Sequence, residues 1–589
     1  MWVGLAPHPG PLPVRRGEGG GRSCTHLFVL LLAVLLFSQP ARAAETNKPN
    51  ILLILADDLG FSDLACYGGE IRTPNIDALA ATGLRFTQTY NSSRCCPSRA
   101  SLLTGLYPHQ AGIGTMAGKD QGLHGYRGRL NDQSVTLAEV LRPAGYATMA
   151  CGKWHVNKPG PIERGFDEFY GFVQGYGVNS WDSNMMIRLP QGRPQRSYAP
   201  GEFYATTAIT DHALDFISTA RQQRKPWLLY LAYQAPHFPL QAPAKTIDSY
   251  IATYERGWDV LRAERLERMK KLGLAPANQS LPPRSPIDNV EAAKRIGSMT
   301  GDGCNPPWDS LDAKRRADLA RRMAAYAAMV EVMDANIGRL VASLREKGEL
   351  DNTLILFLSD NGACAEWESF GFDLDPQKFR NSRAGQGIDV NTQAATNVLH
   401  EGAALAAMGN AESLFSYGSA WANFCNTPLR LYKHFTHEGG IRTPMVVHWP
   451  AGIAGKGEWR QQVAHIMDIM ATCVEAADAK YPSAFAGHDI LTTSGRSLLP
   501  AFRNEPEQPR TLVFEHESNV AIREGNWKLV AQKALARDGL QADVQWELYN
   551  LADDPFEQRN LVAEKPELVE RLSRKFLEEA RRTNILPKP

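Results

Sequence analysis

The chain has 589 residues, and its 64 Lys and Arg against 63 Asp and Glu leave a formal net charge of +1. This balance gives no general attraction to nucleic acid or to an anionic membrane, so nucleic-acid binding is not expected. Hydrophobic residues make up 43% and charged residues 22%, which is ordinary globular usage and excludes global disorder. The length favours two or three domains.

The first 43 residues are predicted to be a secretory signal. An apolar run over 27–37 is too short to span a bilayer of about 30 Å but suits the h-region of a signal. Arg15, Arg16 and Arg22 precede this run, and Ala41-Arg42-Ala43 follows it as an A-x-A cleavage site. We therefore expect an exported protein, periplasmic or extracellular, with no membrane span after cleavage.

The nine cysteines are too few for a disulfide scaffold at this length, and no C-x-x-C pair indicates structural zinc. An exported protein could oxidise some of them, but their spacings specify no pairing. Buried, inert thiols are expected for most, with Cys95 as the exception argued below.

Beyond the signal, short apolar runs alternate with helical patterns. Strands are predicted over 51–56, 84–90, 147–151, 227–233, 353–359 and 445–449. Helices are predicted over 135–141, 206–222 and 317–347. Continuous apolar strands that alternate with helices predict an α/β fold, a large and mostly parallel sheet sandwiched by helices. In such sheets, functional sites gather at the carboxyl ends of the strands.

After about residue 505 the pattern changes to short strands over 511–515, 520–523 and 527–530 and a terminal helix over 566–582. We therefore predict a large first domain over 44–505 and a smaller α+β domain over 506–589 that carries an antiparallel sheet. Two segments interrupt the first domain: 240–310, with a basic helical patch over 262–271, and 365–425. They are predicted to be walls of a substrate cleft or, with equal weight, surface decoration.

Polar side chains follow two of the predicted strands. Asp57 and Asp58 come directly after the first strand, and Asp360 and Asn361 directly after the strand over 353–359. A pair of Asp residues alone is more typical of a helix cap or a solvated turn. Carboxylate and amide oxygens that meet at one sheet edge, however, suit a hard cation such as Ca²⁺ or Mg²⁺. The two strand ends together therefore favour a metal site.

A third motif lies at the start of a predicted helix. Pro97 suits the first turn of a helix that runs to about Thr104, which places Cys95 at the helix N-terminus, where free N–H groups favour an anion. Arg99 is expected to point back toward the same spot. A soft thiolate is a poor match for a hard cation held by oxygens, so we expect Cys95 to be chemically modified.

The motif Cys95-x-Pro97-x-Arg99, followed by Leu-Leu-Thr-Gly over 102–105, resembles the signature of the type I sulfatases of the alkaline phosphatase superfamily. In that family a formylglycine-generating maturation enzyme oxidises the cysteine to formylglycine. Cys96 lacks Pro and Arg at the required offsets, so Cys95 is the expected target. Arg94 departs from the family pattern, which usually shows a small or apolar residue there.

The resemblance extends over most of the mature chain. Similar blocks lie at 73–77, 152–155, 164–167, 235–237, 426–442 and 547–555. The amino-acid sequence over 426–442 is most similar to that of bacterial arylsulfatases. The family resemblance implies an alkaline phosphatase-like catalytic domain over 44–505. His109 and His516 are expected to have structural or outer roles, and Arg523 and Lys528 to lie in the C-terminal sheet.

The resemblance also implies a set of site residues. One Ca²⁺, or Mg²⁺, would be held by an oxygen of modified Cys95 together with Asp57, Asp58, Asp360 and Asn361. The nucleophile and the sulfate would be surrounded by Arg99, Lys153, His155, His237 and Lys433. His237, with Lys433, would protonate the leaving oxygen, and His155 would take a proton from the hydrated aldehyde so that sulfate is expelled.

The sequence thus predicts an exported, Ca²⁺-dependent sulfuric ester hydrolase that acts on small-molecule or glycan sulfate esters. One alternative is a phosphomonoester or phosphonate ester hydrolase of the same superfamily, but Asn361 stands where two-zinc relatives place a histidine. The other alternative is a non-catalytic glycan-binding protein, if Cys95 stays unmodified.

Overall fold

The computed structural model describes residues 48–175, 179–287, 290–295, 297–365, 369–375, 397–506 and 508–589. The predicted signal over 1–43 and part of the segment 365–425 lie outside the described residues. Among the described helices, none combines the length and the apolar character that crossing a membrane requires.

A sheet of ten strands forms the centre of the fold. Its strands are β1 (Asn50–Ala56), β2 (Leu84–Tyr90), β3 (Ala147–Lys153), β4 (Glu168–Phe172), β5 (Ile187–Leu189), β6 (Trp227–Ala232), β7 (Thr353–Ser359), β8 (Arg442–His448), β9 (Glu458–Arg460) and β10 (Ala464–His465). Their order is β10-β2-β8-β7-β1-β6-β3-β4-β5, with β9 paired to β2.

The four central strands set the polarity of this sheet. β1 runs parallel to β6 and β7, and β3 runs parallel to β4 and β6. β8 is antiparallel to β2 and β7, and β5 is antiparallel to β4. The prediction of a mostly parallel sheet is therefore confirmed, and β7, β1, β6 and β3 present their carboxyl ends at one edge.

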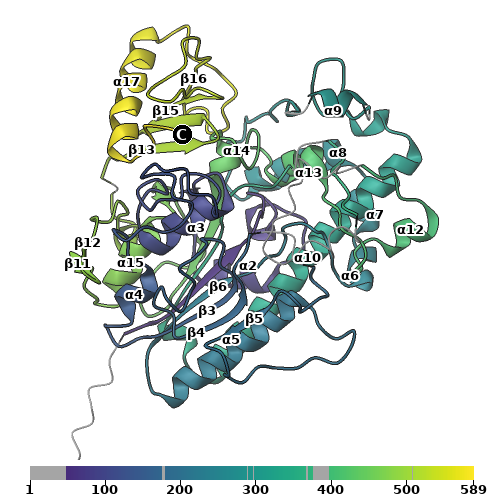
Figure 1. Cartoon of the computed structure of the whole chain (residues 1–589). Coiled ribbons are helices and arrows are strands. Elements are labelled where there is room, and N and C mark those ends of the chain that lie inside the picture. Colours follow the sequence, from purple (N-terminus) through teal and green to yellow (C-terminus); the bar gives the residue numbers. More distant parts are fainter. Residues whose placement is uncertain are drawn as a thin grey trace, which may run out of the picture. The chain divides into compact units, whose positions relative to one another are not determined.

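Helices cover both faces of the sheet (Figure 1). In β1, Leu52 and Ile54 belong to one apolar cluster and Ile51 and Leu53 to another, because successive strand residues point to opposite faces. The first cluster includes residues of α2 (Pro74–Thr82), α5 (Ala205–Gln222) and α10 (Ala313–Glu346). The second includes residues of α3 (Cys95–Thr104), α4 (Leu137–Leu141) and α15 (Asp468–Ala476).

Two predicted helices begin at a different residue from the one expected, and a capping side chain explains each start. The side chain of Thr136 accepts a hydrogen bond from the N–H of Glu139, and the carboxylate of Glu139 accepts one from the N–H of Thr136, so α4 begins after Thr136. Asp312 accepts the N–H of Arg315 at 2.9 Å, so α10 begins four residues before the predicted position 317. Both caps satisfy helix N–H groups that have no partner within the helix.

The segment 240–310 forms helices that pack on the rest of the chain. It contains α6 (Ala244–Asp248), α7 (Ile251–Tyr254), α8 (Trp258–Lys271) and α9 (Val290–Arg295). The predicted basic patch is partly wrong, because Arg265 of α8 is fully buried. Its guanidinium lies 2.8 Å from Asp63 and 2.8 Å from Glu70, and this pairing compensates its desolvation.

The C-terminal part carries a four-stranded antiparallel sheet, as predicted. It consists of β13 (Thr511–His516), β14 (Asn519–Glu524), β15 (Trp527–Ala531) and β16 (Glu547–Asn550), with α17 (Pro566–Arg582) packed on it. Arg523 lies in β14 and Lys528 in β15, both as predicted. β16 was not predicted, because its four residues are too short to show an alternating pattern.

The remaining helices and strands are η1 (Ala65–Tyr67), η2 (Trp308–Ser310), η3 (Leu350–Asn352), α12 (Gly402–Ala407), α13 (Gly418–Cys425), α14 (Glu438–Ile441), α16 (Leu499–Phe502), β11 (Ala484–Phe485) and β12 (His488–Asp489). The eight cysteines of the described residues are all free thiols, and six of them are buried. This agrees with the expectation of buried thiols.

Candidate active site

Four polar residues meet at the carboxyl ends of β1 and β7. In the parallel register Ala56 lies opposite Ser359, so Asp57 and Asp58 leave the sheet at the same level as Asp360 and Asn361. The backbone N–H of Asp58 donates to Oδ1 of Asp360 at 3.3 Å, and all four side chains are buried. We call these four residues the strand-end cluster.

The strand-end cluster leaves two oxygens without a hydrogen-bond partner. Nδ2 of Asn361 donates to Oδ1 of Asp58 at 2.7 Å, while Oδ1 of Asn361 and Oδ1 of Asp57 are buried and accept no hydrogen bond. A buried oxygen without a partner is costly unless something positive faces it. Carboxylate and amide oxygens are the ligands that a hard cation takes, so this set of residues fits Ca²⁺ or Mg²⁺.

The surroundings of Asp360 and Asp58 shift the pKa values of these two carboxylates in opposite directions. Burial and the negative charge of Asp57 raise the pKa of Asp360 well above its ordinary value, against the effect of Arg99. Burial also raises the pKa of Asp58, but Lys433 and His237 outweigh it and hold this pKa below its ordinary value. A bound cation would favour the ionised form of every carboxylate in the cluster.

Cys95 begins α3 beside this cluster, as the position of Pro97 predicted. All ten residues of α3 are buried, and Cys95 is only 2% exposed. A hydrogen bond with Cys96 lowers the pKa of Cys95 well below its ordinary value, and the charges of His155 and Lys153 act in the same direction against burial. Position 95 therefore favours an anionic group.

Arg99 lies one helical turn after Cys95 and binds the cluster. Its Nη2 donates to Oδ2 of Asp360 at 2.7 Å and lies 3.5 Å from Oδ2 of Asp57. Its Nη1 donates to the carbonyl of Lys153 at 3.0 Å. Arg99 thus fixes the end of β3 against the strand-end cluster, in addition to supplying positive charge.

Two buried lysines reach the same cluster from different parts of the chain. Lys153 is the last residue of β3, and its Nζ lies 2.5 Å from Oδ2 of Asp57. Lys433 lies in the loop before α14, and its Nζ donates to Oδ2 of Asp58 at 2.9 Å. Each ammonium brings a buried positive charge to the cluster, which would favour a bound anion.

Two histidines complete the predicted set. His237 follows β6; its Nδ1 lies 2.7 Å from the carbonyl of Phe238, and its Nε2 lies 3.5 Å from Oδ2 of Asp58. His155 follows β3 with φ of 52°, and its buried Nδ1 has no hydrogen-bond partner. Burial, with Lys153 nearby, lowers the pKa of His155 to about 4, so its imidazole is neutral at neutral pH.

Two contacts of this site were not predicted. Sγ of Cys364 lies 3.6 Å from Nζ of Lys433. Asn426 accepts the N–H groups of Phe61 (3.2 Å) and Ala363 (3.1 Å), and it donates to the carbonyls of Leu431 (3.0 Å) and Gly439 (2.8 Å). The block over 426–442 contained Asn426, but its role as a connector of loops has no sequence signal.

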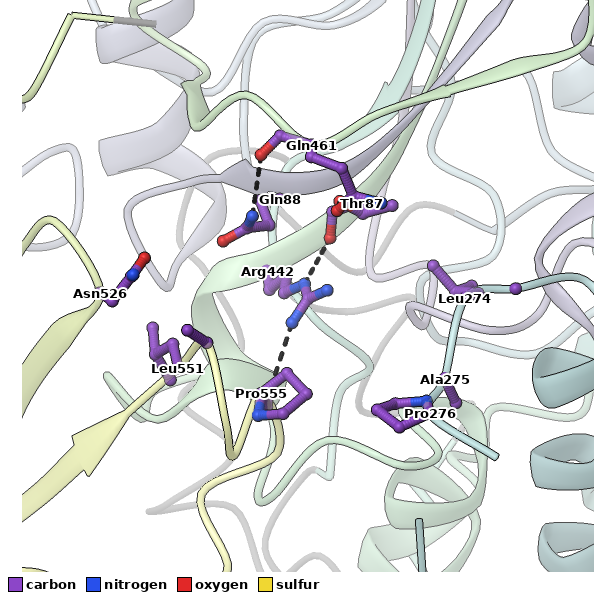
Figure 2. A pocket seen from close by; sticks show the side chains of 12 residues that line it. Thr87, Gln88, Leu274, Ala275, Pro276, Arg442, Gln461, Asn526, Leu551 and Pro555 are labelled. Atoms are coloured by element: carbon purple, nitrogen blue, oxygen red, sulfur yellow. Dashed lines mark hydrogen bonds between the residues drawn. The ribbon is translucent and has the colours of Figure 1, made fainter. Parts of the chain in front are cut away.

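A separate pocket of about 510 Å³ contains none of the predicted site residues. Figure 2 shows Thr87, Gln88 and Gln461 on one side of it and Asn526, Leu551 and Pro555 on another. Between these sides, Arg442 donates to the carbonyls of Thr87 at 2.6 Å and Pro555 at 3.3 Å. The guanidinium therefore ties β2 to the C-terminal part of the chain.

Two family models match the chain. The model described as Sulfatase matches residues 49–479, and the model described as N-sulphoglucosamine sulphohydrolase, C-terminal, matches residues 430–582. Because the first match covers well over half of the chain, the chain belongs to the sulfatase family.

Individual proteins agree with this membership. An uncharacterised sulfatase of Schizosaccharomyces pombe is 33% identical, over 93% of this chain and 96% of that protein. The arylsulfatase of Klebsiella aerogenes is 32% identical, over 79% of this chain and 94% of that protein. A solved structure described as Ps i-CgsB in complex with k-i-k-neocarrahexaose has a TM-score of 0.58 at 24% identity, over 92% of this chain and 94% of that chain, and shows the shared fold.

These relatives establish the class of reaction. The chain is a sulfuric ester hydrolase, as the resemblance of the motif around Cys95 predicted. The individual roles of the site residues stay predictions at this point.

Proposed function

We propose that this chain is an exported sulfatase that cleaves sulfate monoesters with formylglycine made from Cys95 and with a Ca²⁺ held by Asp57, Asp58, Asp360 and Asn361. A maturation enzyme would oxidise Cys95. The observation that carries the proposal is the pair of buried oxygens without partners, Asp57 Oδ1 and Asn361 Oδ1, next to a buried cysteine whose surroundings favour an anion.

The modified residue and the metal would supply the nucleophile. Once modified and hydrated, position 95 would supply a hydroxyl for attack on sulfur, and a cation held by the strand-end cluster would supply charge that favours ionisation of that hydroxyl. The protein's own part is to hold the sulfate in line and to move protons.

Lys153 and Lys433 suit the task of holding the sulfate. Both ammonium groups are buried and ion-paired to the strand-end cluster, so their positions are fixed before substrate arrives. Their positive charges can stabilise the negative charge of the sulfate oxygens in the transition state, and this effect is strong in a site that excludes water.

His237 and His155 suit opposite proton transfers. Nδ1 of His237 is anchored by the carbonyl of Phe238 at 2.7 Å, so the protonated ring can donate from Nε2 to the departing oxygen. His155, with its pKa lowered to about 4, is neutral at neutral pH and can accept a proton from the group at position 95. General acid and base assistance of this kind contributes about 10²–10⁴-fold each.

The substrates are sulfate monoesters of aryl alcohols or of sugars. A sulfated glycan is a substrate class that an exported enzyme would meet. The solved structure described with a bound neocarrahexaose has the same fold as this chain. The segments 240–310 and 365–425 are proposed to set the choice of ester as walls of the cleft.

Tandem mass spectrometry of the tryptic peptide over 95–99, from protein purified from its native host, tests the first half of the proposal. An aldehyde at position 95 and a thiol at position 96 are expected. Chelation followed by addition of Ca²⁺ or Mg²⁺, with hydrolysis of an aryl sulfate as the readout, tests the second half. Loss of activity that Ca²⁺ restores better than Mg²⁺ is expected.

Two results would contradict the proposal. An unmodified thiol at position 95 in active protein would remove the formylglycine mechanism. Faster hydrolysis of the matched aryl phosphate than of the aryl sulfate would favour the phosphoester alternative instead.

A further inference from the structure

Two histidines and a glutamate meet beside Arg94, the residue before Cys95, and the proposed function does not use them. His434 follows Lys433, His516 ends β13, and Glu517 lies in the turn between β13 and β14. One ligand atom from each, two imidazole nitrogens and a carboxylate oxygen, lie within 4.8 Å of one another. The turn of the C-terminal sheet thus brings two metal-binding side chains to a third that follows an active-site lysine.

Glu517 lies between the two rings. Its Oε2 is 3.0 Å from Nδ1 of His434, and its Oε1 is 3.6 Å from Nε2 of His516. The backbone on the His434 side is fixed, because its N–H donates to Ser93 at 3.0 Å and its carbonyl accepts from Asn519 at 3.0 Å. The loop that carries His434 and the turn that carries Glu517 are therefore tied to each other, and this holds the three side chains together.

His516 provides an independent indication of a ligand. It is fully buried, and neither of its ring nitrogens has a hydrogen-bond partner. A neutral imidazole has one N–H donor and one acceptor nitrogen, and burial of both without partners is unfavourable unless another group binds them. A metal ion bound at Nε2 would satisfy the acceptor nitrogen.

We propose that His434, His516 and Glu517 form a binding site for a divalent transition-metal ion such as Zn²⁺, separate from the Ca²⁺ site. Imidazole nitrogens favour this class of ion over Ca²⁺ and Mg²⁺, which prefer oxygen. Tetrahedral ligands at Zn–N distances of about 2.0–2.1 Å lie about 3.3 Å apart, so small movements of the three side chains bring them to a metal. Three protein ligands leave the fourth position for water or an anion.

The positive group that now occupies this space is Arg94. Its Nη1 lies 2.6 Å from both ring nitrogens of His434 and 3.7 Å from Oε1 of Glu517. A metal ion and a guanidinium would repel each other at this range, so the metal binds in exchange for Arg94. This exchange assigns a role to the residue at which the motif around Cys95 departs from the family.

Cobalt binding to the full chain tests the proposal, because Co²⁺ occupies nitrogen-containing zinc sites and its absorption reports the ligands. The Cys95→Ser background removes the thiol next to Cys96 and His155, and excess Ca²⁺ occupies the strand-end cluster. One Co²⁺ with tetrahedral absorption is expected. We expect His516→Ala to abolish it and Glu517→Gln, at a half-exposed side chain that should not affect folding, to weaken it at least about tenfold.

Two further variants complete the test. Arg94→Ala should tighten Co²⁺ binding, because it removes the competing charge, and an unchanged affinity would overturn the exchange. His488→Ala, at an exposed histidine of β12, should have no effect. Equal Co²⁺ absorption in the parent and in both the His516 and Glu517 variants, or no bound Co²⁺ in the parent, would overturn the metal site. The readout is metal binding, so the result is independent of the proposed hydrolytic mechanism.

Discussion

The strand-end cluster and the buried charges under the C-terminal sheet are alike in burial but differ in how their charges are paired. Lys528 lies 2.8 Å from Glu438 and 2.7 Å from Glu557, and all three side chains are fully buried. The N–H of Glu438 donates to Glu557 at 2.9 Å, and the hydroxyl of Tyr90 donates to Glu438 at 2.9 Å. We call Lys528, Glu438 and Glu557 the Lys528 cluster.

The way in which buried charges are paired distinguishes a structural cluster from a candidate binding site. In the Lys528 cluster both carboxylates lie against one ammonium: Oε1 of Glu557 accepts no hydrogen bond, but it lies 2.7 Å from Nζ of Lys528. Lys528 and Arg442 outweigh burial and hold the pKa of Glu438 below its ordinary value. In the strand-end cluster two oxygens stay open although two lysines and an arginine are close. The first arrangement holds parts of the chain together, whereas the second has buried oxygens that a bound cation would satisfy.

The largest expected effect is on the active-site side of this comparison. Cys95→Ala should lower kcat/KM for an aryl sulfate by at least about 10⁴-fold, because it removes the precursor of the nucleophile. Cys95→Ser should instead retain one sulfo group on residue 95 without turnover, which intact-protein mass spectrometry would show. The matched control is Cys96→Ser, which should keep most of the activity; sustained turnover by Cys95→Ser would refute the mechanism.

The corresponding change in the Lys528 cluster should affect stability. Lys528→Met removes the ammonium from Glu557 and leaves Glu438 with Arg442 at 3.5 Å, and we expect the free energy of unfolding to fall by about 3–5 kcal/mol. Urea unfolding measures this. Lys533→Met, at an exposed lysine, is the control and should change stability little.

Measuring kcat of the same variant tests whether the Lys528 cluster has only a structural role. In the Lys528→Met variant, kcat per folded molecule should stay close to that of the parent below the unfolding transition. A large loss of kcat with unchanged stability would mean that the Lys528 cluster acts in catalysis.

A smaller effect is expected for the proton donor. His237→Ala should slow hydrolysis of alkyl or sugar sulfates by about 10²–10³-fold, since these leaving groups need a proton. With 4-nitrophenyl sulfate, whose leaving group is stable as an anion, the loss should be clearly smaller. Equal losses with both esters would exclude His237 as the group that protonates the leaving oxygen.

The smallest effect is a pH dependence of stability at the edge of the large sheet. Burial, with Arg510 nearby, lowers the pKa of His465 to about 3, whereas an unfolded histidine titrates near about 6.5. The unfolded chain therefore binds more protons between these values. Stability contributed by the neutral ring is complete above about pH 6.5 and is lost as pH falls toward about 3, by up to about 1.4 kcal/mol per pH unit.

His465→Asn should make this slope smaller by the contribution of His465, while His155, whose pKa is also lowered, keeps its own contribution. Nδ1 of His465 accepts the N–H of Met467 at 3.2 Å, and the Asn oxygen can accept the same bond. Urea unfolding at several values between about pH 4 and 6 measures the slope, and His124→Asn, at an exposed histidine, should leave it unchanged. A parent-like slope in His465→Asn would place the titrating group elsewhere.

Much of the catalytic edge could be predicted because its signals are local. Asp57 and Asp360 each follow an apolar run directly, and parallel strands deliver such residues to one edge. Cys95 and Pro97 indicate a helix start within a few residues. These patterns do not depend on knowing which distant segments come into contact.

The contacts that were not predicted join segments far apart in the chain. Cys364 approaches Lys433 across 69 residues, and Arg265 pairs with Asp63 across 202 residues. On a helix wheel Arg265 is one more charge in a basic run, and only its acidic partners show that it is buried. His516 was expected to be structural, and its approach to His434, 82 positions earlier in the chain, has no signal in the sequence.

The bonds of Asn426 have a consequence for how the family can diversify. One side chain joins the backbone after β1, the backbone after β7 and both sides of the loop that carries Lys433. None of these bonds involves the helices of 240–310. These helices are attached separately, through Arg265 to Asp63 and Glu70. Their outer surfaces can therefore vary between relatives while both attachments are kept, so that one chemical centre is redirected to new esters.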